Sequence, residues 1–333
     1  MSLVIRKAIV DMLITLYPNS PSMQGEKLDL PGTITKAASK QTYYTIRFLM
    51  DRDRVRDAFR AYAYFRWVDD RLDNNTGTQQ EKKAFIDQQR ALLETCYRRE
   101  YPADPSPEEQ MLVDLVGNDK EKESGLQIYL RNMMEVMSFD VERRGRVISN
   151  TELSQYSLLL STAVTEYMFY FIGHQDPPPS SPGRYEAVYG AHVVHMLRDM
   201  VDDIALGYIN IPGEVLEAEH IPLDDFNSHA FRMWVVERVK LTQRNFETGK
   251  KYISKVKCLR CRLAGFAYLA RFEWMLRAIE RDRYCLRTKY PERKSIKTGL
   301  WMAWRIFTSL LNIPWTKNAP DDHASLQDQC EER

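Results

Sequence analysis

The stretch His192–Gly207, His-Val-Val-His-Met-Leu-Arg-Asp-Met-Val-Asp-Asp-Ile-Ala-Leu-Gly, decides the fold and chemistry that we expect of this chain. It contains no Pro, its only Gly comes last, and its apolar residues recur at helical spacing, so it predicts a helix. Four polar side chains at steps of 3, 4 and 4 residues fall on one stripe of that helix: His192, His195, Asp199 and Asp203. Carboxylates on successive turns lie roughly 6 Å apart and can share a hard divalent cation, although helical carboxylates often belong to a solvated face.

A similar stretch stands far upstream, Tyr62–Asp73, Tyr-Ala-Tyr-Phe-Arg-Trp-Val-Asp-Asp-Arg-Leu-Asp. Asp69 and Asp73 again share a face one turn apart, and Arg66 and Tyr62 continue that stripe towards the N-terminus. Unpaired charges at the end of an otherwise apolar helix are costly to bury. Since an arginine also precedes the acids of the first stretch, the two stretches together predict one cleft that holds cations and binds an anion.

The composition sets the broad class of the protein. Its 333 residues, 44% of them hydrophobic, suffice for a sizeable core in one large helical domain or two average ones. The 47 basic and 46 acidic residues leave a net charge of +1, which favours neither a nucleic-acid nor a membrane partner, and we expect no nucleic acid. No apolar run predicts a transmembrane helix, and the N-terminus is too short and interrupted for a signal peptide. Five irregularly spaced Cys indicate no disulfide framework, so we expect a cytoplasmic protein.

Helical periodicity without sustained period-two alternation predicts a single all-α domain over residues 1–333. Its ends are expected to be an N-terminal extension, 1–35, and a flexible C-terminal tail, 314–333. A Pro-rich linker at 173–183 separates the two halves of the helical pattern. Helices are predicted near residues 39–51, up to 73, 80–99, 107–117, 124–142, 152–172, 185–206, 224–250, 252–286 and 296–312.

Two helix starts carry candidate caps. Asp51 or Asp53 is expected to cap the helix of the first Asp motif, and Asn150 or Thr151 the helix 152–172. The latter helix is apolar or aromatic on nearly all sides, which predicts a central, buried position. Its aromatic rings are also candidates for the wall of a cation-binding cleft, although core packing would explain them equally well.

Four stretches carry a resemblance to a known family: Ala38–Tyr44, Tyr62–Asp73, Tyr156–Thr165 and Met196–Asp203. The two Asp-x-x-x-Asp motifs, about 130 residues apart and with Arg-Asp opening the second, are the most specific of these features. In these stretches the chain resembles the squalene/phytoene synthase family of isoprenoid synthases, and the resemblance fades after about residue 290. It implies an isoprenoid (terpenoid) synthase fold, a helical bundle around a central cleft in which the two motifs face each other.

The resemblance implies a Mg²⁺-dependent enzyme, with Mn²⁺ as an alternative ion, that ionises a prenyl diphosphate such as farnesyl or geranylgeranyl diphosphate. The family typically joins two prenyl diphosphates head to head through a cyclopropyl intermediate and releases pyrophosphate. Because the leaving group carries several negative charges, such a site needs oxygen-liganded metal and basic donors. Squalene-type members use NADPH and phytoene-type members do not, so NADPH use stays open here. A lipid product also leaves room for peripheral contact with a membrane.

The expected roles follow from the motifs and the resemblance together. The expected metal ligands are Asp69, Asp73, Asp199 and Asp203, with Asp70 and Asp202 as second choices. These two are second because neighbouring positions on a helix point about 100° apart. The expected catalytic residues are Tyr62, Arg66, His192, His195 and Arg198. The expected substrate-binding residues are Ser39, Tyr43, Tyr156, Tyr208 and Tyr268. The two arginines would hold diphosphate oxygens or the carboxylates, unless they are ordinary surface ion pairs.

The two histidines are the first departure from the family pattern, because His192 and His195 stand where the family has Gln and Asn. We expect both to line the floor of the cleft. A neutral imidazole that titrates near neutrality can donate to diphosphate, or act as the base that ends a cation cascade. The alternative is that both are satisfied helix histidines.

Other departures lie later in the chain. The basic pair that usually follows the second motif is replaced by Ala205-Leu206. A late Tyr of the family falls nearest Phe272, with Tyr268 one turn earlier. Three basic residues could stand in for the family's late cation: Lys289, Arg293 and Lys294. We therefore expect intact ionisation but altered steering of the intermediate.

Three other functions compete with head-to-head coupling. The chain could ionise a single prenyl diphosphate and cyclise it, or prenylate a different acceptor. It could be a non-catalytic assembly or lipid-binding factor, although such a factor has no evident use for four motif carboxylates. A di-iron carboxylate bundle needs Glu-x-x-His pairs, whereas this chain offers only His195-x-x-x-Asp199.

Overall fold

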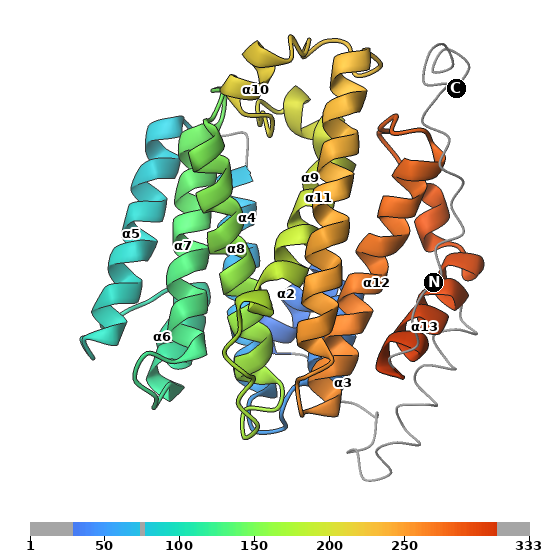
Figure 1. Cartoon of the computed structure of the whole chain (residues 1–333). Coiled ribbons are helices and arrows are strands. Elements are labelled where there is room, and N and C mark those ends of the chain that lie inside the picture. Colours follow the sequence, from blue (N-terminus) through green and yellow to red (C-terminus); the bar gives the residue numbers. More distant parts are fainter. Residues whose placement is uncertain (1–28, 74–76, 312–333) are drawn as a thin grey trace.

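The computed structural model describes residues 29–73 and 77–311, and these residues are helical apart from their connections (Figure 1). One isolated parallel bridge joins Val147 and Ile209. The predicted all-α class is therefore confirmed, while residues 1–28 of the expected extension and the whole of the expected tail lie outside the described residues. The elements are α2 (Leu30–Ala38), α3 (Lys40–Leu49), α4 (Val55–Asp73), α5 (Gln79–Tyr97), α6 (Pro107–Asn118), α7 (Gly125–Arg143), α8 (Asn150–Phe171), η1 (Pro182–Arg184), α9 (Glu186–Ala205), α10 (Gly213–Ala218), α11 (His229–Ile253), α12 (Leu259–Arg281), η2 (Pro291–Lys294) and α13 (Ile296–Leu310).

Hydroxyl side chains fix where several helices begin. Capping boxes, in which the cap and the third helical residue bond each other's backbone N–H groups, open three helices: Thr78 with Glu81 (α5), Ser106 with Glu109 (α6) and Ser149 with Glu152 (α8). The expected caps Asn150 and Thr151 are wrong by one and two residues. Ser149 is the position with a glutamate three residues onward, and that spacing decides the start of α8.

The helix of the second Asp motif, α9, packs against α8, α11 and α12 (Figure 1). Its closest approach is to α11, at Gly249 and Gly190. A Cβ added to Gly249 would lie 2.6 Å from the Cβ of Ala187, and one added to Gly190 would lie 3.0 Å from the ring of Phe246. Two glycines thus let the backbones of α9 and α11 come together.

The N-terminal end of α9 is anchored by a buried ion pair. Residues 173–181 form the predicted linker without helix. Arg184 in η1 then donates from Nε and Nη2 to the two carboxylate oxygens of Glu166 on α8, both at 2.8 Å, and the Tyr185 hydroxyl donates to the same carboxylate at 2.9 Å. Because bidentate pairs restrict orientation, this contact fixes where α9 leaves α8.

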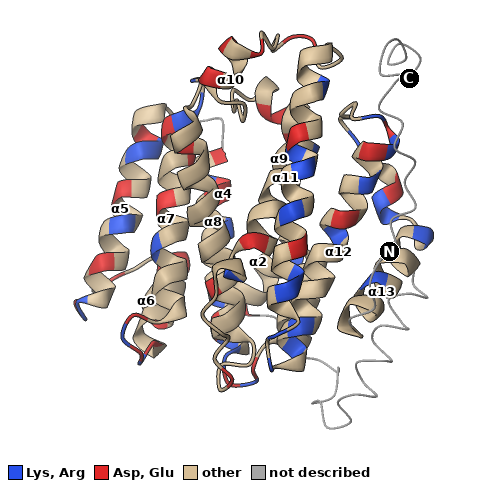
Figure 2. Ribbon diagram, in the orientation of Figure 1, with Lys and Arg blue, Asp and Glu red and all other residues tan. Residues whose placement is uncertain are grey.

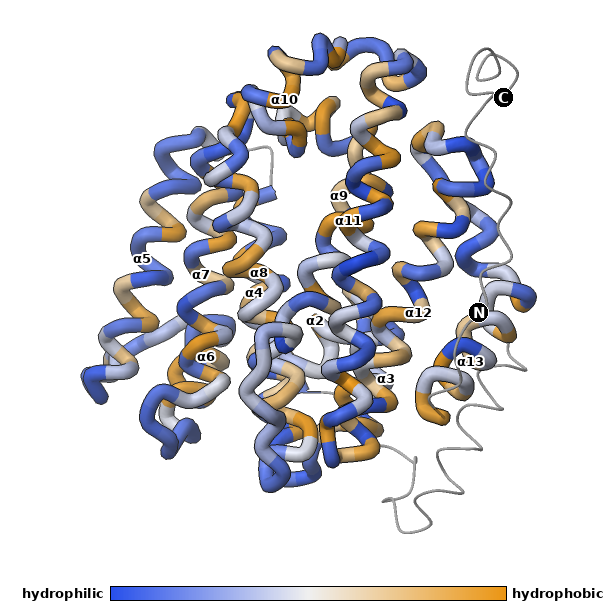
Figure 3. Tube along the Cα trace, in the orientation of Figure 1, coloured by the Kyte–Doolittle hydropathy of each residue, from blue (hydrophilic) through white to orange (hydrophobic). Residues whose placement is uncertain are grey.

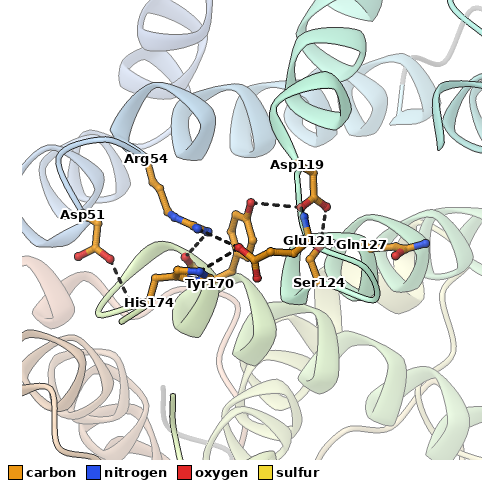
Figure 4. A network of polar contacts seen from close by, with 8 residues as sticks. All are labelled: Asp51, Arg54, Asp119, Glu121, Ser124, Gln127, Tyr170 and His174. Atoms are coloured by element: carbon orange, nitrogen blue, oxygen red, sulfur yellow. Dashed lines mark hydrogen bonds and ion pairs between the residues drawn. The ribbon is translucent and has the colours of Figure 1, made fainter. Parts of the chain in front are cut away.

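The expected cap Asp51 has a different role. Its carboxylate accepts backbone N–H bonds from Gly173 and His174, at 3.2 and 3.0 Å, and these bonds hold its pKa below the usual range despite burial. It joins a polar network at the C-terminal end of α8 (Figure 4). There Arg54 donates to the Tyr170 carbonyl and to Glu121, which also contacts His174. The network ties three connecting segments together, so the prediction that Asp51 caps α4 is wrong.

The apolar helix α8 is less enclosed than its sequence predicts. It packs against α7 and α9, and Phe171 is fully buried, but Leu158 is 53% exposed. The Met-rich face of α7 does belong to the core, where Met134 and Met137 are buried. Within the described residues, no helix has an apolar stretch long enough to span a bilayer.

Candidate active site

The first Asp motif lies on the C-terminal half of α4. Arg66 donates to Asp69 at 2.9 Å and also contacts Asp70. Burial and the neighbouring Asp73 carboxylate raise the pKa of Asp69 to about 6. A raised pKa means that nearby positive groups do not fully balance the negative charge of the ionised carboxylate. A bound cation would balance that charge.

The second motif lies on the last turns of α9. The Asp199 carboxylate accepts from Arg198 Nε at 2.6 Å and contacts His195 Nε2 at 3.2 Å. Burial alone would raise the pKa of Asp199, but these two contacts hold it well below its usual range. One turn on, burial and the Asp199 charge raise the pKa of Asp203 to about 6.

A carboxylate on α7 stands between the two motifs. Asp140 is close enough to both Asp69 and Asp203 to raise the pKa of each. The hydroxyl of Tyr156 donates to Asp140 at 3.1 Å, and Arg143 Nε donates to it at 2.6 Å. Asp140 on α7 thus lies within electrostatic reach of one aspartate from each motif.

The buried Arg143 links α7 to the second motif. Its Nη1 donates to Asn210 Oδ1 at 2.6 Å, and Asn210 Nδ2 donates to Asp203 Oδ2 at 2.8 Å. The guanidinium carbon lies 4.7 Å from the ring centre of Tyr156 and 5.0 Å from that of Tyr208. Two predicted substrate-binding tyrosines therefore flank a cation at the edge of the carboxylate cluster.

The acids fit a hard divalent cation by their chemistry. Their donors are all oxygen, and two of them have raised pKa values that a cation would lower. Within residues 29–73 and 77–311, no three His, Cys, Asp or Glu side chains are gathered as a formed metal site. The second-choice ligands Asp70 and Asp202 are both exposed, but so is the first-choice ligand Asp73, so exposure does not separate the two sets.

One histidine does not fit the role that the sequence suggested. His192 is buried, its ring packs edge-on against Tyr156 at 5.2 Å, and neither ring nitrogen has a hydrogen-bond partner among the described residues. Burial, with His195 and Arg143 nearby, lowers the pKa of His192 to about 3. The prediction that His192 titrates near neutrality is therefore wrong, since an apolar site excludes the imidazolium. His195 is half exposed and directed at Asp199.

A basic hollow borders the second motif. It is a shallow hollow open to solvent, lined by Val194, Arg198, Arg271, Phe272, Met275 and Arg293. Burial, with Arg293 and Arg198 close by, lowers the pKa of Arg271. Neither Arg271 nor Arg293 forms an ion pair within residues 29–73 and 77–311. Three guanidinium groups around one hollow favour a multiply charged anion.

The remaining predicted residues lie at the margins. Ser39 accepts from the Thr42 N–H at 3.1 Å as the N-cap of α3, and Tyr43 stacks near Phe59 at 5.2 Å between ring centres. Tyr268 packs against Phe272 with ring centres 5.0 Å apart, and burial raises its pKa to about 12. Tyr62 is half-buried on α4. It lies close enough to Arg271 to offset part of the lowering of the arginine's pKa. Ser39 thus has a structural role at a helix start, whereas the tyrosines line apolar surface.

Sequence reasoning missed four polar residues of this site: Asp140, Arg143, Asn210 and Arg271. An Asp-x-x-Arg pair on the last turns of a Met-rich helix was the available signal for Asp140 and Arg143. Of the three late basic candidates, Arg293 lines the hollow, and Lys289 and Lys294 do not.

Comparisons with known proteins identify the family of the chain. The squalene/phytoene synthase family matches residues 35–297, well over half of the chain. A presqualene diphosphate synthase from Zymomonas mobilis is 26% identical over 203 residues, a match that covers 59% of this chain and 64% of that protein, less than two thirds of its length.

Two solved structures share the fold. The squalene synthase HpnC from Alicyclobacillus acidocaldarius superposes with a TM-score of 0.62 at 19% identity, covering 77% of this chain and 94% of that one. A dehydrosqualene synthase solved with a ligand superposes with a TM-score of 0.66 at 14% identity, covering 85% and 95%. At these identities the superpositions show the helical fold alone. By its sequence match over residues 35–297, carried on that fold, the chain belongs to the squalene/phytoene synthase family.

Proposed function

We propose that this chain is a Mg²⁺-dependent isoprenoid synthase that ionises a prenyl diphosphate and joins two such molecules head to head, with release of pyrophosphate. One observation carries the proposal. Asp140 lies within electrostatic reach of Asp69 on α4 and of Asp203 on α9, and a hollow lined by three arginines, one of them Arg198 next to Asp199, borders the second motif.

The arginines suit the leaving group. A diphosphate in the hollow would accept charge-assisted hydrogen bonds from Arg198, Arg271 and Arg293. When the allylic C–O bond breaks, the bonding pair leaves with the diphosphate, and preorganised cations stabilise the charge that develops there. The allylic carbon then forms a bond to the second prenyl chain, which loses a proton.

The carboxylates suit the metal. Asp69, Asp73, Asp199 and Asp203 would hold Mg²⁺, with Asp140 as a further acidic neighbour. When bound, the ion supplies Lewis-acid neutralisation of the diphosphate. Arg66 and Arg198 would hold Asp69 and Asp199 in orientation until then, and the Arg198 contact also favours the ionised form of Asp199.

The family and its relatives support coupling over other outcomes. The name of the Zymomonas mobilis relative, a presqualene diphosphate synthase, supports a coupled diphosphate as the product here. The experiment below is run with and without NADPH, and the comparison tests whether NADPH reduces that product.

The test incubates the enzyme with farnesyl or geranylgeranyl diphosphate and Mg²⁺, with and without NADPH. Pyrophosphate is measured, and products are identified by mass spectrometry. A product of doubled carbon number supports the proposal. A product of unchanged carbon number would show a cyclase instead, and the absence of pyrophosphate release from folded protein would favour a non-catalytic factor.

The metal is tested in the same assay. EDTA should abolish pyrophosphate release and excess Mg²⁺ or Mn²⁺ should restore it. Asp199→Asn should lose turnover, whereas Asp87→Asn, an exposed carboxylate on α5, should keep it. Release that persists in EDTA would exclude the metal mechanism.

A further inference from the structure

The last described helix, α13, exposes an apolar stripe. Five large apolar side chains on one face are each between 52% and 62% exposed: Ile296, Leu300, Trp304, Phe307 and Leu311. Their spacing of 4, 4, 3 and 4 residues keeps them on one side of a helix. Figure 3 shows the same recurrence of apolar residues along α13.

The opposite face of α13 is fixed to the body of the protein. Arg305 is buried and donates from Nε and Nη2 to Glu273 on α12, both at 3.0 Å. The guanidinium of Arg277, also on α12, lies 5.0 Å from the ring centre of Trp301. Because this side is held by α12, the stripe faces away from the described helices.

Basic residues border the stripe at its N-terminal end. Four exposed cations fall within nine residues: Lys289, Arg293, Lys294 and Lys297 (Figure 2). The helix itself contains no Asp or Glu. A chain of net charge +1 therefore concentrates positive charge beside its exposed apolar helix.

We infer that α13 is a docking surface for an anionic lipid membrane, on which the helix lies flat. An apolar stripe with Trp on it and Lys beside it is the pattern of interfacial helices, in which anionic headgroups attract the cations. The inference goes beyond the proposed reaction and does not depend on it.

A second copy of the chain fits this face less well. Taking roughly 200 Å² for each large side chain, five that are half exposed offer on the order of 500 Å². A stable protein interface buries about 800 Å² on each partner. A bilayer needs no matching surface, so the available area and the charge both favour lipid.

The position of the helix adds a functional consequence. Arg293 lines the basic hollow and stands three residues before the first residue of α13. Docking α13 would therefore bring η2 and this side of the hollow to the lipid surface, where apolar prenyl chains are dissolved.

The experiment is sedimentation of the full chain with vesicles of phosphatidylcholine alone or mixed with phosphatidylglycerol. We expect binding to the mixed vesicles that weakens with salt. Leu300→Glu should reduce the ratio of vesicle-bound to free protein by about tenfold or more. The change removes a Leu side chain that docking would bury in lipid, and it adds a negative charge. Leu158→Glu, a similarly exposed Leu on α8, is the matched control and should bind like the parent.

The charges are tested by replacing Lys294 and Lys297 with Gln together. At about 1 kcal/mol for each cation at an anionic surface, the bound-to-free ratio should fall by about 30-fold for mixed vesicles. Brominated lipid should quench the fluorescence of the parent more than that of Trp304→Phe. Circular dichroism melting establishes that each variant is folded.

Three results would overturn the inference. These are a parent chain that does not sediment with mixed vesicles, a Leu158→Glu variant as impaired as Leu300→Glu, or a dimer in sedimentation velocity that Leu300→Glu dissociates. Pyrophosphate release from detergent-dispersed substrate is measured alongside. It should be unchanged in Leu300→Glu, so loss of docking and loss of catalysis are read separately.

Discussion

Asn210 donates a hydrogen bond to Asp203 across 2.8 Å, from a loop to the last turn of α9. The same amide accepts from the buried guanidinium of Arg143 on α7. A neutral side chain thus holds a cation of one helix and a carboxylate of another at a fixed separation. The Asp203 carboxylate is oriented without being neutralised by direct pairing, which leaves its charge available for a metal.

Replacing this amide should cost stability and activity together. Asn210→Ala leaves a buried Arg143 donor unpaired, and we expect the free energy of unfolding to fall by about 1–3 kcal/mol. Turnover should fall because Asp203 loses its orientation. Chemical denaturation and steady-state kinetics measure the two effects, with the exposed-loop variant Asn227→Ala as the control. A variant with normal kinetics would show that Asn210 does not position Asp203.

Neutralising Asp203 should stabilise the metal-free protein at neutral pH. Its folded pKa of about 6 lies above the ordinary value of 3.8. Ionisation of Asp203 therefore lowers the free energy of unfolding, and this loss develops as the pH rises through the interval between the two values. Asp203→Asn should therefore be more stable than the parent at pH 7.5, by about 1–2 kcal/mol after discounting for solvent screening, and equal to it near pH 4. Thermal melts in EDTA across this range measure the difference. A variant that melts below the parent at pH 7.5 would make Asp203 a structural partner.

The buried imidazole predicts acid sensitivity. The folded pKa of His192, about 3, lies below the ordinary 6.5, so the unfolded state binds the extra proton between these values and stability falls as pH falls. Between pH 6.5 and 3, the free energy of unfolding of His192→Phe should fall by a few kcal/mol less than that of the parent. His229→Phe, at an exposed position at the start of α11, is the control and should leave the profile as steep as in the parent. Equal slopes for the parent and His192→Phe would mean that His192 is accessible to protons.

The basic hollow predicts a defect in substrate binding. Arg271→Gln removes one of three guanidinium groups, and a hydrogen bond to a charged group contributes about 1.5–3 kcal/mol, so KM for the prenyl diphosphate should rise about 10- to 100-fold. Arg271→Lys keeps a positive charge at this position, so its KM should rise less than that of Arg271→Gln. Arg281→Gln, an exposed arginine at the end of the same helix, is the control and should leave KM unchanged. An unchanged KM in Arg271→Gln would place the diphosphate elsewhere.

The sequence predicted those parts of the site that repeat along one helix. Asp69 and Asp73 on α4, and Asp199 and Asp203 on α9, share a face because of their four-residue spacing alone. The fold class followed from periodicity. Such features are local, so residue spacing suffices to find them.

The rest of the site depends on which helices meet. Asp140 is on α7, and its proximity to both motifs comes from the packing of α7 beside α4 and α8, which no local pattern encodes. The protonation of His192 was mispredicted for the same reason, because the lowering of its pKa comes from enclosure by other helices. The assignment of metal and substrate roles to these residues remains a prediction.

Gly249 on α11 affects the position of α9, and therefore of the second Asp motif, although Gly249 is not itself part of the site. Ala187 of α9 rests on that glycine, so the volume there limits how far α9 can shift along its own axis. Metal–oxygen bonds of about 2.0–2.1 Å tolerate only small displacements, whereas one helical turn spans about 5.4 Å. A larger residue at position 249 would move the second pair of carboxylates relative to the first. Tuning of the reaction is therefore available on α11, as an adjustment of the axial register of α9, without replacing any residue that carries the chemistry.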